Sequence, residues 1–178
     1  NCTCEDNKPC NECDNCNAIN ENSHPDIIEI DAASNNGVDE VRELIEKVKY
    51  APIQGKFKVY IIDEVHMMTP GAFNALLKTL EEPPEHVVFI LATTDVHKVI
   101  PTVLSRCQRF DFSKINFEDI KKRVTDILKL ENISYEEGVD NLVAELADGG
   151  MRDALSILDQ VVSYAGDDIR LQHIYDIY

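Results

Sequence analysis

The sequence lacks the features that would place a protein in a membrane or outside the cell. None of its apolar runs approaches the roughly 18 residues that a membrane-spanning helix needs. No secretory signal is visible. The chain opens on Asn1-Cys2 without a methionine, so we expect a fragment, and a leader upstream of it stays an open alternative. From the residues present we expect a cytoplasmic protein with no membrane partner.

The sequence also has little positive charge. It contains 17 Lys and Arg residues against 33 Asp and Glu residues, which gives a formal net charge of −16 over 178 residues. Such a surface repels phosphate backbones, so any contact with nucleic acid is expected to come through a larger assembly. Hydrophobic residues make up 44% of the chain, enough for a folded core and against global disorder.

A third absence concerns nucleotide binding. The phosphate-binding pattern G-x-x-x-x-G-K-[ST] occurs nowhere, and Gly55-Lys56 is the nearest fragment of it. Because that loop supplies the main-chain N–H groups that surround phosphates, this stretch by itself is expected to bind nucleotide poorly and to be inactive.

The apolar pattern predicts an α/β domain followed by a helical one. Apolar runs that alternate with helical periodicity indicate parallel strands joined by helices. Strands are expected at 26–31, 58–63, 87–94 and 109–112, with helices at 38–50, from Pro70 to before Pro83, and at 101–104. Beyond a boundary near residue 113, helices are expected at 117–131, 136–147, 151–164 and 169–177, with no strand.

Five of the six cysteines lie in the first sixteen residues. Such clustering favours a metal site in a reducing compartment over a disulfide framework. PCNECDNC spaces Cys10, Cys13 and Cys16 by two residues each, which lets thiolates converge on one zinc ion. An iron–sulfur cluster is the main alternative, but the C-x3-C-P continuation of ferredoxins is missing. Spacing leaves open whether Cys2 or Cys4 is the fourth ligand, and free or disulfide-bonded cysteines are the plainest alternative.

The apolar run KVYIID is followed at its end by two adjacent acids, Asp63 and Glu64. Parallel strands carry ligand sites at their carboxyl ends, where an Asp can hold Mg²⁺ and a Glu can polarise water. A second run, FILATT, ends on Thr93 and Thr94 at the same expected edge. Two solvated acids after a strand would be the simpler interpretation of the pair.

Several strings in the sequence together resemble the gamma/tau subunits of bacterial DNA polymerase III, which are the AAA+ ATPase motors of the replicative clamp loader. The resemblance runs over nearly the whole chain, and the SRC and LLKTLEEPP strings are its most specific parts. The strings are PCNECDNC, DIIEIDAASNNGVDEVRELI, VYIIDEVHMM, FNALLKTLEEPPEHVVFILATTD, LSRC and GGMRDALS.

The resemblance implies a role for each candidate residue. Asp63 and Glu64 would be the Walker B acids, and Thr93, with Thr94, would be sensor 1. The family's phosphate loop lies upstream of its zinc knuckle, so the chain is expected to begin after that loop. The family's Asn-Cys dipeptide makes Cys2 the preferred fourth zinc ligand, although the gap is one residue shorter than usual.

Two arginines complete the implied site. Arg106, in SRC, would be an arginine finger offered to the ATP of a neighbouring subunit, and Arg152 would be sensor 2 in the lid. The implied organisation is a zinc knuckle over 1–25, the remaining AAA+ domain over 26–112 and a helical lid over 113–178.

The implied function is loading of the sliding clamp onto primed DNA with ATP and Mg²⁺, alongside delta, delta-prime and further gamma/tau subunits. Delta-prime is the closest alternative, but it is not expected to keep an acidic pair like Asp63-Glu64. A zinc-bearing scaffold without catalysis is a second alternative. A helicase, suggested by DEVH, is a third, which the SRC string and the helical lid disfavour.

Overall fold

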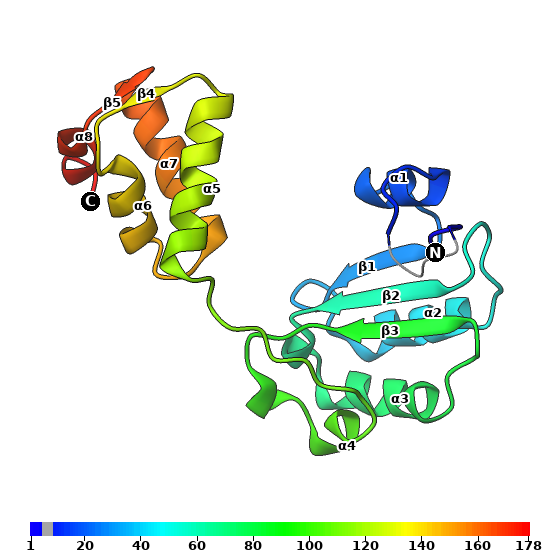
Figure 1. Ribbon diagram of the computed structural model, residues 1–178. Coiled ribbons are helices and arrows are strands. Elements are labelled where there is room, and N and C mark those ends of the chain that lie inside the picture. The colour runs from blue at the N-terminus through cyan, green and yellow to red at the C-terminus, as the bar shows by residue number, and fades with distance from the viewer. Residues whose placement is uncertain (5–8) are drawn as a thin grey trace. The chain divides into compact units, whose positions relative to one another are not determined.

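The computed structural model describes residues 1–4 and 9–178 of the chain. The chain divides into two compact units, Asn1–Arg109 and Phe110–Tyr178, each built around its own apolar core (Figure 1). Within the described residues, we find no helix with the length and apolar character needed to span a membrane.

The first unit is built on a three-stranded parallel sheet in the order β1-β2-β3. Its central strand, β2, ends at Asp63, the first residue of the acidic pair, as the sequence predicts. Parallel neighbours joined by helices confirm the predicted α/β class. The elements of this unit are α1 (Asp14–Asn20), β1 (Ile27–Asp31), α2 (Val38–Val48), β2 (Lys58–Asp63), the 3-10 turn η1 (Val65–Met67), α3 (Pro70–Glu81), β3 (Val87–Leu91), the 3-10 turn η2 (Val96–Lys98) and α4 (Pro101–Leu104).

Local sequence signals set the limits of α3. Thr69 caps its start, since its side chain accepts a hydrogen bond from the Ala72 N–H at 3.2 Å. Pro70 occupies the first helical position, where a missing N–H costs nothing. The helix stops before Pro83, so both predicted ends are confirmed.

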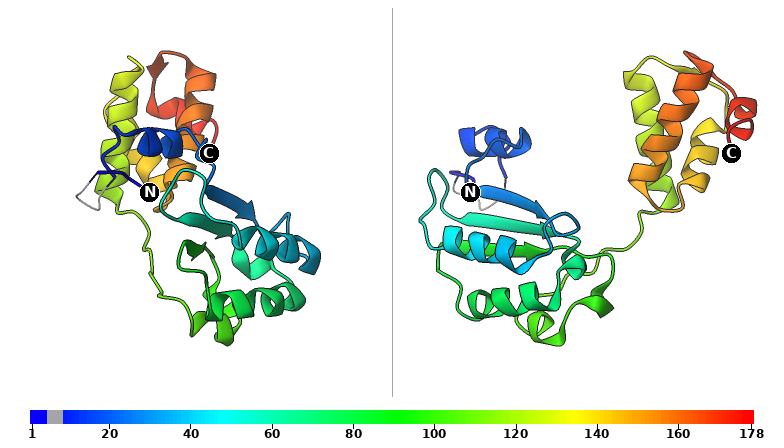
Figure 2. Two further views of the ribbon diagram at one scale, coloured as in Figure 1. Left: turned by 90° about the vertical axis from the view of Figure 1, so that its right-hand side faces the viewer. Right: turned by 180° about the vertical axis from the view of Figure 1, so that it is seen from behind.

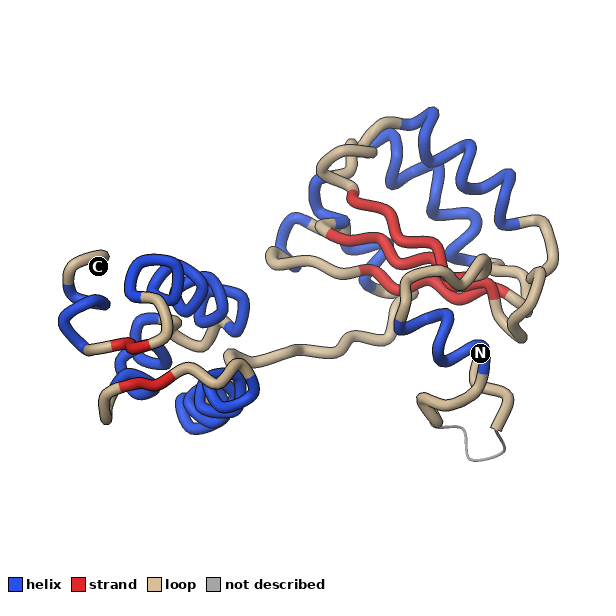
Figure 3. The backbone as a smooth tube through the Cα atoms, turned by 90° about the horizontal axis from the view of Figure 1, so that it is seen from above, coloured by secondary structure: helices blue, strands red, loops and turns tan. Residues whose placement is uncertain are grey.

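Helices α2 and α3 pack on the same face of the sheet (Figure 2). Seen from above, the strands form one layer with these helices beside it (Figure 3). Tyr60 and Ile62 of β2 point into the resulting core. On the other face Val88 and Ile90 of β3 stay 39% and 47% exposed. Burial on both faces, which the apolar run of β2 suggested, is therefore complete on one face only.

The second unit is a small helical bundle that also contains one pair of short parallel strands. The sequence predicts no strand here, which is wrong, because two short segments pair as parallel strands. Each is only two residues long, too short to leave a periodic pattern. The elements are α5 (Phe117–Leu130), β4 (Ser134–Tyr135), α6 (Val139–Leu146), α7 (Met151–Ala165), β5 (Asp168–Ile169) and α8 (Leu171–Tyr175).

Other predictions in the first unit need correction. Residues 109–112 are not a strand, because alternating apolar residues do not create a hydrogen-bonded neighbour, and the described sheet consists of β1, β2 and β3. β3 ends at Leu91 rather than at residue 94. The knuckle region, predicted to be loop-rich, contains the seven-residue helix α1.

Candidate functional site

The candidate site lies at the carboxyl edge of the sheet, where two strands end on acids side by side. Asp63 is the last residue of β2 and stands in register with Asp31, the last residue of β1. The Ser34 hydroxyl and the Ala33 N–H both donate to Asp31 and lower the pKa of its carboxyl. Carboxylates gathered at an edge suit a hard cation such as Mg²⁺.

Glu64 leaves the end of β2 in an unusual backbone conformation. Its φ is 48°, in the left-handed region, and in the described part of the chain the other non-glycine residues with positive φ are Asn or Asp, which tolerate it better. The turn is held by main-chain bonds, since the Glu64 N–H donates to Asp63 Oδ1 at 2.9 Å and the Val65 N–H donates to the Ala92 carbonyl at 2.9 Å. Strain of this kind is often found at functional sites.

Two side chains contact the Glu64 carboxylate, and a third, Thr93, joins them through His66, which links the two strand ends. The Thr94 hydroxyl donates to Glu64 Oε2 at 3.0 Å. His66 Nδ1 lies 3.3 Å from the same oxygen and 2.9 Å from Thr93 Oγ1. Thr93 Oγ1 in turn accepts the N–H of Asp95 at 3.0 Å. The fold thus brings Asp63, Glu64, Thr93 and Thr94 together, as the sequence predicts for neighbouring parallel strands.

His66 is a residue that sequence reasoning missed. Its side chain is 9% exposed and contacts both Glu64 and Thr93. The signal was present in DEVH, where His66 follows Glu64 by two positions. Only the turn η1 shows that this spacing brings the imidazole back onto the carboxylate.

Arg106 lies just beyond α4 and is bound to its own chain. Its guanidinium donates to the Thr102 carbonyl at 2.6 Å and to the Ser105 hydroxyl at 3.3 Å. It also forms an ion pair with Glu81 at the end of α3. The structure therefore places Arg106 among partners of its own subunit, apart from the acids at the strand ends.

Arg152 belongs to the second unit. It is exposed and lies in the first turn of α7.

A second candidate site is formed by four cysteines near the start of the chain. Their Sγ atoms all lie within 4.8 Å of one another, and the four are Cys2, Cys10, Cys13 and Cys16. Cys10 Sγ lies 3.8 Å from Cys16 Sγ, and Cys13 Sγ lies 4.0 Å from Cys2 Sγ. Thiolates at 2.3 Å from a tetrahedral zinc would be about 3.8 Å apart. The donor set and its size therefore fit zinc.

Hydrogen bonds to sulfur distinguish the thiols in this cluster. The backbone N–H groups of Thr3 and Cys16 lower the pKa of Cys13 to about 5. The backbone N–H of Cys4 lowers the pKa of Cys2. The neighbouring thiols of Cys10 and Cys2 instead raise the pKa of Cys4 to about 12. The backbone N–H of Asn11 acts to lower the pKa of Cys16, but burial and the neighbouring Cys13 thiol raise it to about 11, so a raised pKa does not mark a cysteine outside the cluster. Cys2 is favoured over the exposed Cys4 by position, since its Sγ lies within the group of four sulfur atoms and that of Cys4 does not.

The cysteine cluster is tied to the sheet through one loop. The Asn1 side chain accepts from the Phe57 N–H and donates to the Phe57 carbonyl, both at 2.8 Å. The fully buried carboxylate of Asp26 accepts the N–H groups of Ile53, Gln54 and Gly55, each at 2.7 Å. This loop leads into β2, so the knuckle and the acidic edge lie at opposite ends of one strand.

Comparison with protein-family models covers most of the chain. Residues 1–116 match the family described as DNA polymerase III, delta subunit. The chain belongs to this family. Residues 119–167 match the model of the DNA polymerase III clamp loader subunit, ATPase lid domain.

The curated relatives that match the chain include gamma and tau subunits of DNA polymerase III. The chain is 58% identical over 165 residues to DNA polymerase III subunit tau of Bacillus subtilis, covering 93% of this chain and 29% of the relative. It is 48% identical over 166 residues to the tau subunit of Escherichia coli, covering 93% and 26%. A gamma subunit of Buchnera aphidicola is 42% identical over 161 residues, covering 90% and 44%. The predicted resemblance is confirmed, and the chain spans less than half the length of these relatives.

Solved structures show the same fold at low sequence identity. A Thermotoga maritima RuvB Holliday junction branch migration motor superposes with a TM-score of 0.69 at 14% identity, covering 84% of this chain and 51% of that one. A DNA polymerase III gamma subunit-related protein of the same organism gives 0.50 at 23% identity, covering 84% and 62%. The fold is thus of the AAA+ type with a helical lid, as predicted.

Proposed function

We propose that this chain is part of the ATPase motor subunit of a replicative clamp loader, which uses ATP to place a sliding clamp on primed DNA. One observation carries the proposal. Asp63 ends the central parallel strand, Glu64 follows it, and the Thr94 hydroxyl, from the segment after the neighbouring strand β3, reaches the Glu64 carboxylate at 3.0 Å. An acidic pair joined to a polar neighbour at this edge suits phosphoryl chemistry.

Each residue at the edge is assigned one task. The Asp63 carboxylate would hold Mg²⁺, which supplies charge stabilisation at the phosphates. Glu64 would orient the attacking water and accept its proton. Thr93 and Thr94 would sense the terminal phosphate through their hydroxyls, and the Thr94 contact keeps the Glu64 side chain in one orientation. The left-handed backbone at Glu64 fixes the direction in which its side chain leaves the strand.

The two arginines would supply positive charge. A guanidinium keeps its charge and can contact two phosphate oxygens at once. We assign Arg106 to the ATP of a neighbouring subunit and Arg152 to sensor 2 of the lid. For Arg106 this requires exchange of its ion pair with Glu81 for the phosphate.

The knuckle would hold one structural zinc ion through Cys2, Cys10, Cys13 and Cys16. Its support is the approach of the four Sγ atoms, and the donor set is the one that structural zinc prefers. All six cysteines are free in this structure, in line with the reducing cytoplasm that we propose as the protein's location.

The proposed partners are other clamp-loader subunits, namely delta, delta-prime and further gamma/tau copies, together with the sliding clamp. Primed DNA would be contacted through the assembly, because a chain with a net charge of −16 repels phosphates on its own.

A change at Glu64 tests the proposal. In the full-length protein assembled with its partners, Glu64→Gln should bind ATP normally but hydrolyse it at least about a hundredfold more slowly, a loss of about 3 kcal/mol. Glu85→Gln is a matched control, since Glu85 is exposed and precedes β3 at the opposite end of the strands. Normal hydrolysis by Glu64→Gln would show that the acidic pair is structural.

We also propose that residues 1–178 alone do not hydrolyse ATP, because this sequence holds no G-x-x-x-x-G-K-[ST] loop. A release assay for inorganic phosphate on the isolated chain tests this. Turnover that depends on Glu64 would contradict it.

A non-catalytic subunit is the second candidate. The description of the matching family as a delta subunit favours it, whereas the names of the relatives favour gamma/tau. The Glu64→Gln assay separates the two, since a non-catalytic subunit would contribute no Glu64-dependent turnover to the assembly.

A further inference from the structure

The imidazole of His66 lies between the ends of two neighbouring parallel strands. The 3-10 turn η1 brings it back toward the end of β2, and its side chain is only 9% exposed. Its Nδ1 lies 2.9 Å from Oγ1 of Thr93, which follows β3, and 3.3 Å from Glu64 Oε2. One ring nitrogen therefore contacts both a proposed phosphate sensor and the glutamate proposed to orient the attacking water.

The main chain holds this ring in place. The Val65 N–H donates to the Ala92 carbonyl at 2.9 Å and so joins the turn to the segment after β3. Val65 itself is buried in the core. Because the turn is anchored on both strands, the His66 ring is kept beside Glu64.

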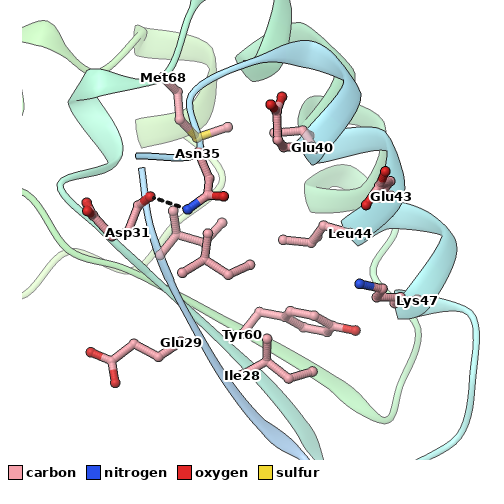
Figure 4. Close-up of a pocket in the computed structure, with 13 residues that line it drawn as sticks. Ile28, Glu29, Asp31, Asn35, Glu40, Glu43, Leu44, Lys47, Tyr60 and Met68 are labelled. Atoms are coloured by element: carbon pink, nitrogen blue, oxygen red, sulfur yellow. Dashed lines mark hydrogen bonds between the residues drawn. The ribbon is translucent and has the colours of Figure 1, made fainter. Parts of the chain in front are cut away.

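Glu64 is held differently from the acid that ends the neighbouring strand β1. Asp31 is held by its own loop, where the Asn35 side chain donates to its carbonyl and two groups of the loop donate to its carboxylate (Figure 4). The Glu64 carboxylate is instead contacted by the side chains of Thr94 and His66. The orientation of Glu64 therefore responds to changes at those side chains, whereas the orientation of Asp31 is set locally.

The Nδ1 atom of His66 can serve its two neighbours in two ways. Without a proton, it accepts from the Thr93 hydroxyl, and its lone pair then offers no hydrogen bond to the Glu64 carboxylate. With a proton, it donates toward Glu64 Oε2 and Thr93 Oγ1, and the hydroxyl hydrogen of Thr93 is free to bind elsewhere. Since Thr93 Oγ1 also accepts the N–H of Asp95 at 3.0 Å, the direction of its hydrogen decides between the two arrangements.

Contact with a phosphate selects the second arrangement. A Thr93 hydroxyl that donates to a phosphate oxygen cannot donate to Nδ1. The ring then gains a proton at Nδ1 and gives one up at Nε2, both exchanged with water, so the neutral imidazole keeps one proton throughout. Nδ1–H donates to Glu64 Oε2, which the Thr94 hydroxyl already contacts at 3.0 Å. Because both contacts are to Oε2, Oε1 is left to accept the proton of the attacking water.

We propose that His66 is a positioning residue that couples contact between Thr93 and a terminal phosphate to the orientation of Glu64. The inference rests on the function proposed above and adds to it the way in which bound nucleotide aligns the glutamate. Without nucleotide, Nδ1 is occupied by the Thr93 hydroxyl, and Glu64 is held by Thr94. The ring thus makes the alignment of Glu64 depend on the terminal phosphate, which ATP has and ADP lacks.

The protonation of Nδ1 tests this directly. Full-length protein, isotope-labelled at its histidine nitrogens, is measured by NMR without nucleotide, with ADP and with a nonhydrolysable ATP analogue, and His66→Asn identifies the His66 signals. Nδ1 should be unprotonated without nucleotide and with ADP, and protonated with the ATP analogue. In Thr93→Val, which has no hydroxyl hydrogen to donate, Nδ1 should be protonated in all three states. An Nδ1 signal that does not respond to the ATP analogue in the wild type would overturn the proposal.

Kinetics of the assembled complex separate positioning from a structural role. His66→Leu should lower the turnover number for ATP roughly tenfold, because a hydrogen bond to a charged group is lost, while KM stays within about twofold. His66→Asn should recover most of this loss, since its amide places a donor where Nδ1 lies, whereas the longer side chain of His66→Gln should not. His97→Leu is the matched control, because His97 is exposed in the other 3-10 turn, η2, and turnover should stay within about twofold.

Paired changes show whether His66 acts through its two neighbours. In a Thr93→Val or a Glu64→Gln background, His66→Leu should lower the turnover number by no more than about twofold, because the connection is already broken. Losses that multiply, or a His66→Asn protein as slow as His66→Leu, would make the ring a structural residue and overturn the proposal. Circular dichroism of each variant confirms that it is folded.

The same measurements separate this inference from the proposed function. Slow hydrolysis by Glu64→Gln together with full activity of His66→Leu would leave the function intact and remove the role of His66. Normal hydrolysis by Glu64→Gln would instead remove the proposed function, and this inference with it.

Discussion

The Thr94 hydroxyl donates a hydrogen bond to the Glu64 carboxylate at 3.0 Å and so links the ends of two neighbouring parallel strands. Both residues follow apolar strands that the core holds in place. The contact fixes a glutamate whose left-handed backbone already restricts it. The orientation of Glu64 thus depends on a residue thirty positions along the chain.

Replacing Thr94 with Val should lower the turnover number for ATP roughly tenfold without changing KM. Val keeps the shape of Thr but cannot donate, and a hydrogen bond to a charged group is worth roughly 1.5–3 kcal/mol. Thr93→Val should cost at least as much, because Thr93 contacts both His66 and Asp95. Steady-state kinetics of the assembled complex measures both. Faster hydrolysis by Thr94→Val would mean that the contact holds Glu64 in an inactive position.

Elemental analysis of protein purified without added metal should find about one zinc per chain. Cys2→Ser should release the metal, because Cys2 Sγ lies within the cluster of four sulfur atoms. Cys4→Ser is the matched control, two residues away and exposed, and should retain zinc. The reverse outcome would make Cys4 the ligand. Iron with acid-labile sulfide, or a folded protein without metal, would contradict the zinc site itself.

Asp26→Asn should lower the free energy of unfolding by about 3 kcal/mol. The buried carboxylate accepts three backbone N–H groups, and an amide cannot replace all of them. Chemical denaturation at neutral pH measures the loss. Asp14→Asn is a suitable control, since Asp14 is exposed on α1, and a loss as large there would mean that the effect is not specific to the buried network.

The same carboxylate predicts a pH dependence. Burial acts to raise the pKa of Asp26, but the N–H groups of Gly55, Ile53 and Gln54 together lower it below the ordinary value. Its stabilising contribution is therefore fully present above about pH 3.9, the unfolded-state value, and is lost as the pH falls through the folded-state pKa. Wild type should lose more stability than Asp26→Asn below about pH 4. Parallel curves for the two proteins would contradict this.

Much of the fold could be predicted because its strongest signals are local. The apolar run of β2 and the Thr69-Pro70 start of α3 depend on their own residues. Residues 109–112 were wrongly predicted to be a strand, because a strand depends on a neighbour that its own sequence does not specify. The two-residue strands β4 and β5 were missed for lack of length.

The candidate site, like the fold, could be predicted from the sequence only in part. Strand ends marked by polar residues predicted that Asp63, Glu64, Thr93 and Thr94 would meet. His66 was missed because its contact depends on the turn η1. The Glu81 partner of Arg106 could not be predicted either, since it requires the packing of α4 against the end of α3.

Arg106 provides the prediction that tests the assembly. In this structure its guanidinium is bound by Glu81 and the Thr102 carbonyl of its own chain. If it serves a neighbour's ATP, Arg106→Ala should leave the subunit's own ATP affinity intact and reduce hydrolysis at the adjoining site by about 10³-fold or more. Arg106→Lys should rescue little, because an ammonium cannot contact two phosphate oxygens in a fixed plane.

The ion pair with Glu81 separates this role from a structural one. Glu81→Gln removes the competing partner but keeps the guanidinium, and an exposed pair is worth at most about 1 kcal/mol. Hydrolysis should therefore stay unchanged or rise by up to about fivefold, whereas a structural role would make Glu81→Gln as harmful as Arg106→Ala. Mixing Arg106→Ala subunits with subunits whose phosphate loop is disabled should restore partial ATPase activity at the one interface where both parts are intact. Wild-type hydrolysis and clamp loading by Arg106→Ala would leave Arg106 as an ordinary ion-paired residue at the end of α4.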